Sequence, residues 1–416
     1  MKLYGFQKDV LKESEPFNRV AYYYDMGLGK TFIGAEKLRQ FNTRMNIVVC
    51  QKSKLDDWIR HFICNYNVDF FFYDLTNKQH FEHFFVEERR CLGFINYDLL
   101  FRRPELAGLK NFTLLLDESS LIQNETSKRT KFIMKKLKPD NVILLSGTPT
   151  GGKYEKLWSQ LNLLGLDMSK KEYWNRYVKY HVDTRMGFPL TVVDGYKNVY
   201  ELKGKMRKLG CFFKKTEEVF DLPEKHFIRC SVPASDRYKP FMRNSVVKVG
   251  SAELVGDTPL TKLLYARLLC GAYNTDKIQS FKDLAQSTSD RLIVFYNYNE
   301  ELGVLMGAVR DRKLSVVNGK TKNLDNYNNY EDSITFIQYQ AGAMGLNLQK
   351  ANKIVYFTPP LSSELYEQSK KRIHRIGQDK PCLYYNLICK GTVEENIYNT
   401  LALRKDYTDK LFMEEA

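Results

Sequence analysis

Short apolar runs recur along the chain and alternate with longer stretches that mix polar and apolar residues. Such runs are typical of strands buried on both faces of a parallel sheet, and the stretches between them are long enough for helices. The first series comprises residues 20–24, 47–50, 92–95, 112–116 and 142–145, and the second comprises residues 292–296, 314–317, 334–339, 353–357 and 383–387. The pattern predicts an α/β fold with two parallel sheets built from right-handed strand–helix–strand units.

The region between the two series, from about residue 151 to about residue 285, is basic and aromatic, and it has few strand candidates. We therefore expect a helical insertion there. Pro223 would end a preceding helix, so we place the boundary between domains 1–222 and 223–416 beside it. The polar, Asn-rich stretch 320–332 is predicted to be a surface loop.

The net charge of the chain indicates which class of partner it binds. The 64 Lys and Arg residues exceed the 49 Asp and Glu residues, which gives a formal net charge of +15. Residues 128–138 carry six positive side chains and no acid, and residues 197–215 carry seven against one Glu. An excess of this kind favours a polyanion such as nucleic acid, although solvated helix faces would also account for the two runs.

Several classes of protein are disfavoured by what the sequence contains. No apolar run reaches the ~18–20 residues of a membrane helix, and residues 1–15 lack the apolar stretch of a signal peptide. The eight cysteines form no CxxC pair, and the six histidines show no ligand spacing. We therefore expect an intracellular protein with free thiols, without disulfides or a zinc site.

A glycine-rich turn follows the first predicted strand, in the string Asp25-Met26-Gly27-Leu28-Gly29-Lys30-Thr31. Between a strand and a helix, such a turn exposes backbone N–H groups that can surround a phosphate. Lys30 would reach the β- and γ-phosphates of a nucleotide, and the Thr31 hydroxyl would bind Mg²⁺. A chance glycine-rich turn is the competing interpretation.

Adjacent acids, Asp117 and Glu118, follow the strand predicted at 112–116. Open α/β sheets bind ligands at the carboxyl ends of their strands. Asp117 suits a magnesium ligand, and Glu118 suits the group that orients or deprotonates the attacking water. The alternative is that the two carboxylates only cap the next helix. The small residues 146–150 follow the strand predicted at 142–145 and could couple a nucleotide site to a nucleic-acid site, whereas an ordinary turn is the alternative.

The second half contributes a glycine-containing segment, residues 341–348, and a basic string, residues 368–378. Arg372 and Arg375 lie three residues apart and would share one face of a helix. Two such guanidinium groups can act as arginine fingers, which stabilise the charge of a phosphoryl-transfer transition state. The alternative interpretation is a basic helix whose charged face is solvated. His374 is expected to have a packing or hydrogen-bonding role.

Taken in order, these strings resemble the Swi/Snf-type ATPases of helicase superfamily two. The basic string RIHRIGQ at 372–378 is the most specific of them. Further matching segments are 3–7 (LYGFQ), 47–58 (IVVCQKSKLDDW), 96–97 (NY), 157–164 (LWSQLNLL), 293–295 (IVF), 318–319 (NG) and 391–395 (GTVEE). One departure concerns the acidic box, in which Ser119 and Ser120 replace the residue types that commonly relay to the segment at 146–150.

The resemblance implies two RecA-like lobes, ATP and Mg²⁺ as cofactors, and double-stranded DNA as the partner. It implies nucleotide binding by Gln7, Gly27, Leu28, Gly29, Lys30, Thr31 and Gly345, with the metal on Thr31 and Asp117. It implies catalysis by Lys30, Asp117, Glu118, Arg372 and Arg375. It implies nucleic-acid contacts from Lys52, Ser53, Asn96, Tyr97, Thr148, Asn318, Gly319, Ala341 and Gly342.

The expected activity is therefore ATP-driven translocation on duplex DNA. A strand-separating DNA or RNA helicase is the first alternative, and a non-catalytic nucleic-acid scaffold is the second. The Lys-, Asn- and Tyr-rich composition suits a phage or low-GC bacterium, so we expect the cytoplasm of a bacterial or phage-infected cell.

Overall fold

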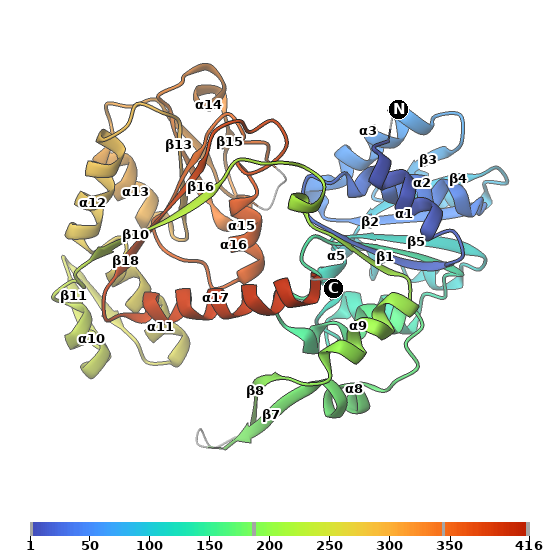
Figure 1. Cartoon of the computed structure of the whole chain (residues 1–416), viewed down its shortest axis with the longest axis horizontal. Helices are drawn as coiled ribbons and strands as arrows, with labels where there is room; N and C mark the ends of the chain where they lie inside the picture. Colours follow the sequence, from blue (N-terminus) through green and yellow to red (C-terminus); the bar gives the residue numbers. More distant parts are fainter. Residues whose placement is uncertain (1–2, 185–188, 343–345, 413–416) are drawn as a thin grey trace. The chain divides into compact units, whose positions relative to one another are not determined.

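Two seven-stranded sheets organise the chain, one in each of two units (Figure 1). The computed structural model describes residues 3–184, 189–342 and 346–412. Unit 1 is Met1–Val219 with Asp406–Ala416, and unit 2 is Phe220–Lys405. The two parallel sheets predicted from the apolar runs are thus confirmed.

The sheet of unit 1 is parallel throughout and has the strand order β3-β4-β2-β5-β6-β1-β9. Its inner strands are almost fully buried, because their apolar side chains face helices on both sides. The strands are β1 (Arg19–Tyr24), β2 (Met45–Cys50), β3 (Phe71–Asp74), β4 (Cys91–Asn96), β5 (Phe112–Asp117), β6 (Asn141–Leu145) and β9 (Cys211–Lys214).

Helices connect these strands, and a hairpin of β7 (Val178–Asp183) and β8 (Leu190–Tyr196) extends beside α8 and α9 (Figure 1). The α-helices are α1 (Gly5–Glu13), α2 (Lys30–Phe41), α3 (Leu55–Tyr66), α4 (Lys78–Val86), α5 (Tyr97–Leu100), α6 (Lys128–Lys135), α7 (Trp158–Leu163), α8 (Lys170–Tyr177) and α9 (Val199–Lys208). The short 3₁₀ helices are η1 (Lys52–Lys54), η2 (Pro104–Gly108), η3 (Ser119–Ile122), η4 (Tyr154–Lys156) and η5 (Thr216–Glu218).

The sheet of unit 2 has the order β10-β18-β17-β13-β16-β14-β15 and is parallel except for the pair β14–β15. A separate hairpin pairs β11 (Val246–Val249) with β12 (Ala252–Val255). The sheet strands are β10 (Lys225–Val232), β13 (Leu292–Tyr296), β14 (Leu314–Val317), β15 (Lys322–Asn323), β16 (Ile334–Gln338), β17 (Lys353–Tyr356) and β18 (Cys382–Cys389).

The α-helices of unit 2 complete its layers. They are α10 (Tyr238–Asn244), α11 (Pro259–Cys270), α12 (Thr275–Gln286), α13 (Asn299–Ala308), α14 (Asp325–Asn329), α15 (Tyr339–Gly342) and α16 (Ser363–Lys370), followed by α17 (Val393–Phe412). Within the three described stretches, no helix is both long and apolar enough to cross a membrane.

The region between the two series contains the expected helices, α7 to α12, but the expectation of few strands there is wrong. Residues 178–255 contain the two hairpins. They also contain β9, which belongs to the sheet of unit 1, and β10, which belongs to the sheet of unit 2. These strands are short or largely exposed, as in β7 and β10, so they lack the apolar runs that mark buried strands. The polar stretch 320–332 likewise contains β15 and α14 besides its turns.

Candidate functional site

Three strands of unit 1 present their carboxyl ends side by side, because β5, β6 and β1 are neighbours in a parallel sheet. The glycine-rich turn follows β1, the two acids end or follow β5, and residues 146–150 follow β6. Segments far apart in the sequence therefore meet at one sheet edge, where α/β sheets bind ligands.

The glycine-rich turn adopts a conformation that requires its glycines. Gly27 and Gly29 have φ values of +90° and +71°, a region that side chains rarely allow. A Cβ atom on Gly29 would also lie 2.4 Å from Nε2 of Gln7. The 12-residue helix α2 starts directly after this turn, so its N-terminal N–H groups lie at the same sheet edge.

Lys30 is the first residue of α2 and lies at this sheet edge. Its Nζ donates hydrogen bonds to the carbonyls of Tyr24 (2.8 Å) and Asp25 (3.2 Å) at the end of β1. A Cβ on Gly147 would lie 3.3 Å from the same nitrogen, so the lysine also adjoins the segment after β6. Thr31 is half-buried in the first turn of α2. Lys30 and Thr31 thus begin α2 directly after the turn.

Gln7 packs against the turn from α1. Its Nε2 donates to the carbonyl of Leu28 at 3.0 Å, and its Oε1 accepts from the backbone N–H of Tyr4 at 3.0 Å. The side chain is buried. This places the predicted adenine-reading amide directly against the predicted phosphate loop, while its part in binding adenine stays a prediction.

Three hydrogen bonds hold Asp117. Its Oδ2 accepts a hydrogen bond of 2.8 Å from Nε1 of Trp58, and its Oδ1 accepts one of 3.1 Å from the N–H of Glu118. The hydroxyl of Tyr97 donates to the carbonyl of Asp117 at 2.8 Å. Burial raises the pKa of Asp117, and the Trp58 hydrogen bond and the charge of Lys30 act in the opposite direction.

Glu118 has an unusual backbone for a residue other than glycine. Its φ and ψ are 50° and 58°, in the left-handed region. Such a conformation costs free energy and persists only where the surroundings fix it, which is frequent at functional sites. The turn lets η3 begin at Ser119, immediately after the two acids.

The predicted nucleic-acid residues of unit 1 differ in exposure. Lys52 and Ser53 are exposed on η1. The side chain of Asn96 caps α5 by accepting from the N–H groups of Asp98 and Leu99. Tyr97 and Thr148 are buried, so in this structure their side chains support the sheet edge. Contacts of all these residues with nucleic acid stay predictions.

The predicted residues of unit 2 lie in turns and a short helix. Asn318 accepts from the N–H groups of Lys320 and Thr321 in a turn that contains the exposed Gly319. Ala341 is buried in α15, which ends at Gly342. Gly345 lies outside the described residues.

The expectation that Arg372 and Arg375 share a helix face is wrong, because α16 ends at Lys370 and turns follow it. Gln378 holds these turns: its Nε2 donates to the carbonyls of Gln349, Ala351 and Ile373. Arg372 is buried, and Nη1 of Arg375 donates to Oδ1 of Asn347. Burial lowers the pKa of Arg375.

His374 has the hydrogen-bonding role expected of it, since its Nε2 lies 2.9 Å from the carbonyl oxygen of Pro223 and would donate to it. The basic string is thus fixed to the segment that enters β10. Its rigidity comes from side chain–backbone hydrogen bonds instead of from a helix.

Two residues that form hydrogen bonds at the site were given no role in the sequence analysis. Trp58 lies in the segment 47–58 and reaches Asp117, and Gln160 lies in the segment 157–164 and bonds to Ser119. In the sequence, the only signal at Gln160 is a polar residue within the leucine-rich segment 157–164, and its burial and its contact with Ser119 emerge from the structure.

The residues at this edge fit a nucleotide with Mg²⁺. The glycine turn, Lys30 and the start of α2 provide N–H and ammonium donors for phosphate oxygens. The Thr31 hydroxyl and the Asp117 carboxylate are the oxygen ligands that Mg²⁺ prefers.

Comparison with known proteins identifies the family of the chain. The SNF2-related domain matches residues 23–268, and the helicase conserved C-terminal domain matches residues 276–377. Two such domains in one chain define a helicase-type protein. The chain belongs to the SNF2-related family, and the family predicted from the motifs is confirmed.

Individual relatives are distant. YwqA of Bacillus subtilis (strain 168) is 23% identical over 94% of this chain and 46% of its own length. The uncharacterized ATP-dependent helicase MG018 of Mycoplasma genitalium is 22% identical over 73% of this chain and 31% of its own length. The chain therefore spans less than half the length of these relatives. The Sulfolobus solfataricus SWI2/SNF2 ATPase core in complex with dsDNA is 19% identical, with a TM-score of 0.47, 98% of this chain covered and 92% of that one.

Proposed function

We propose that the protein is a nucleic-acid-stimulated ATPase that hydrolyses ATP to ADP and phosphate and moves along duplex DNA. The observation that carries the proposal is that Lys30, after β1, and Asp117 and Glu118, at the end of β5, lie at the same sheet edge, with β6 between the two strands. The family, whose relative MG018 is named an ATP-dependent helicase, supports the same class of reaction.

Each residue has a chemical part in this proposal. Lys30 and the N–H groups of the glycine turn bind phosphate oxygens, and Gln7 binds the adenine edge. Thr31 and Asp117 would hold Mg²⁺, which supplies positive charge to the phosphate oxygens when bound. Glu118 orients the attacking water and accepts its proton. Arg372 and Arg375 add positive charge that stabilises the transition state, an effect of ~10³–10⁵ in rate for an arginine finger.

Duplex DNA is the proposed track, bound through its backbone. Lys52, Ser53 and Asn96 offer an ammonium, a hydroxyl and an amide, which bind phosphates without reading sequence. The net charge of +15 supports a polyanion partner. Backbone contacts of this kind suit a motor that must pass every sequence.

Two assays with the same protein test movement against strand separation. The first measures release of a third strand from a blunt triplex, and the second measures separation of a forked duplex. We expect ATP-dependent release of the third strand without separation of the fork, and neither reaction with Lys30→Ala. Separation of the fork would favour the helicase alternative, and failure of both reactions without any ATP hydrolysis would favour the scaffold.

A further inference from the structure

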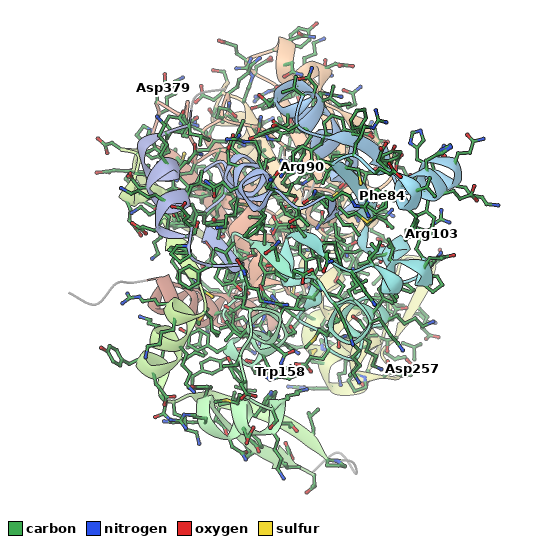
Figure 2. The ribbon with its side chains drawn as sticks, turned by 90° about the vertical axis from the view of Figure 1, so that its right-hand side faces the viewer. Phe84, Arg90, Arg103, Trp158, Asp257 and Asp379 are labelled. Carbon is green, nitrogen blue, oxygen red and sulfur yellow. The ribbon has the colours of Figure 1, made fainter. Side chains whose placement is uncertain are left out.

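The side chain of Gln160 connects two loops of the candidate site from inside the core of unit 1. It lies on α7, whose first residue, Trp158, is labelled in Figure 2, and it is 0% exposed. Its Oε1 accepts from Oγ of Ser119 at 2.8 Å, and its Nε2 donates to the carbonyl of Pro149 at 2.7 Å. One amide therefore joins the segment after the acids to the segment after β6.

A third hydrogen bond fixes the amide to the sheet, since the hydroxyl of Tyr23 donates to the same Oε1 at 3.1 Å. Only one orientation of the amide suits this environment, because the carbonyl of Pro149 requires a donor and cannot face Oε1. Hydrogen bonds in a buried, low-dielectric site are strong and costly to leave unmade. A displacement of either loop therefore acts on the other through Gln160.

Two further bonds reinforce the same connection. Gln123, which follows η3, donates from Nε2 to the carbonyl of Pro149 at 3.0 Å. Ser159, the neighbour of Gln160 on α7, donates from Oγ to the carbonyl of Ile122 at 2.9 Å. The segment from Ser119 to Gln123 is thus attached both to α7 and to the loop that contains Pro149.

We propose that Gln160 is a positioning residue that couples the water-orienting Glu118 to the loop containing Thr148 and Pro149. Glu118 precedes Ser119 in a strained left-handed turn, so a shift of its backbone during ATP hydrolysis moves Ser119 directly. This inference rests on the proposed function and names the residue through which nucleotide turnover and nucleic-acid engagement communicate. It also supplies a relay for a chain whose acidic box ends in Ser119 and Ser120.

A matched pair of variants separates coupling from packing. Ser119→Ala and Tyr23→Phe each remove one hydroxyl donor to Oε1 of Gln160, and in each variant the other donor remains. Only Ser119→Ala removes a bond through which Gln160 joins the two loops, and the bond from Gln123 to Pro149 remains in both variants. The quantity to measure is the ratio of ATP turnover with saturating duplex DNA to turnover without DNA, together with the melting temperature of each variant.

We expect this ratio to fall about 10-fold in Ser119→Ala and to stay within about 2-fold of the wild-type ratio in Tyr23→Phe, because only the first breaks a bond between the loops. Gln160→Leu should lower the ratio as much as Ser119→Ala does. The double variant Ser119→Ala with Gln160→Leu should show no lower ratio than either single variant, since all three remove the same connection through Gln160. Equal ratios in Ser119→Ala and Tyr23→Phe, or multiplying effects in the double variant, would overturn the relay. A wild-type protein without any stimulation by DNA would instead contradict the proposed function.

Discussion

The indole Nε1 of Trp58 donates a hydrogen bond of 2.8 Å to Oδ2 of Asp117. Trp58 is buried on α3 and stacks on Phe62 at 6.0 Å between ring centroids, so its ring has little freedom. The second oxygen of Asp117 accepts from the N–H of Glu118. The proposed magnesium ligand is therefore held in one orientation by a side chain 59 residues away in the sequence.

Trp58→Phe removes this donor and keeps an aromatic ring. We expect ATP turnover to fall about 10-fold and the Mg²⁺ concentration for half-maximal turnover to rise, because the carboxylate loses its fixed orientation. Trp158→Phe is the control, since its Nε1 donates to the carbonyl of Met168 outside the site. Equal turnover and equal Mg²⁺ dependence in both variants would show that Trp58 only packs.

Glu118→Gln keeps the size of the side chain and removes its capacity to accept a proton. We expect ATP to bind with unchanged affinity while turnover falls at least 100-fold, since general-base catalysis typically contributes about 10²–10⁴-fold. Equilibrium binding of a fluorescent ATP analogue and single-turnover hydrolysis measure the two effects separately. If Glu118→Gln weakened ATP binding, and turnover fell only by the same factor, Glu118 would have a role in binding and not in activating water.

Glu301 gives unit 2 a pH-dependent stability. Burial raises the pKa of this carboxyl to about 7, although it accepts hydrogen bonds from the N–H groups of Asn297 and Tyr298 and from the hydroxyl of Thr358. Because the pKa of Glu301 in the folded state lies above the usual value of about 4.5 for a glutamate carboxyl, the folded state prefers the protonated form. The associated stability is complete below pH 4.5 and is lost as the pH rises towards 7.

Glu301→Gln should therefore match the wild-type protein in stability at pH 4.5 and exceed it at pH 8, by a difference on the order of 3 kcal/mol. Chemical denaturation across this pH range measures the difference. Glu300→Gln, at an exposed position on the same helix, is the control and should show no such trend. A wild-type protein that gains stability relative to Glu301→Gln between pH 5 and 8 would contradict the assignment.

Lys277 and Glu394 form a buried ion pair in unit 2, with Nζ 2.7 Å from each carboxylate oxygen and exposures of 0% and 1%. Burial is the largest single influence and lowers the pKa of Lys277, but the charge of Glu394, its hydrogen bond and the nearby Cys389 and Cys270 together raise the pKa above its usual value. Lys277→Met leaves a buried carboxylate without its counterion. We expect a loss of about 3–5 kcal/mol in unfolding free energy.

The double variant Lys277→Met with Glu394→Leu should recover most of this stability, because the two apolar side chains replace the pair without a stranded charge. Urea denaturation of both variants measures the recovery. If Lys277→Met alone were as stable as the wild-type protein, the carboxylate of Glu394 would not depend on Lys277 as its counterion.

The strands of both apolar series could be predicted because buried parallel strands need continuous apolar residues, as in β2 and β13. β7 and β10 escaped prediction because their exposed faces carry polar residues. The positions of Lys30, Asp117 and Glu118 followed from motifs that begin or end at strands. The contacts of Trp58 with Asp117 and of Gln160 with Ser119 join residues 59 and 41 positions apart, so only the fold reveals them.

The turns after α16 show a second limit of prediction from sequence spacing. The basic string has helical spacing, but side-chain hydrogen bonds from Gln378 and His374 to backbone carbonyls compete with a helix there. Spacing alone does not reveal this competition.

The most direct test of the proposed motor is ATP turnover at one fixed salt concentration without nucleic acid and with duplex DNA, single-stranded DNA or RNA. We predict strong stimulation by duplex DNA, a steep fall of that stimulation with salt, and no turnover in Lys30→Ala. Arg39→Ala, which alters an exposed arginine on the same helix, should behave as the wild-type protein. Turnover that duplex DNA leaves unchanged, or that survives in Lys30→Ala, would contradict the proposal.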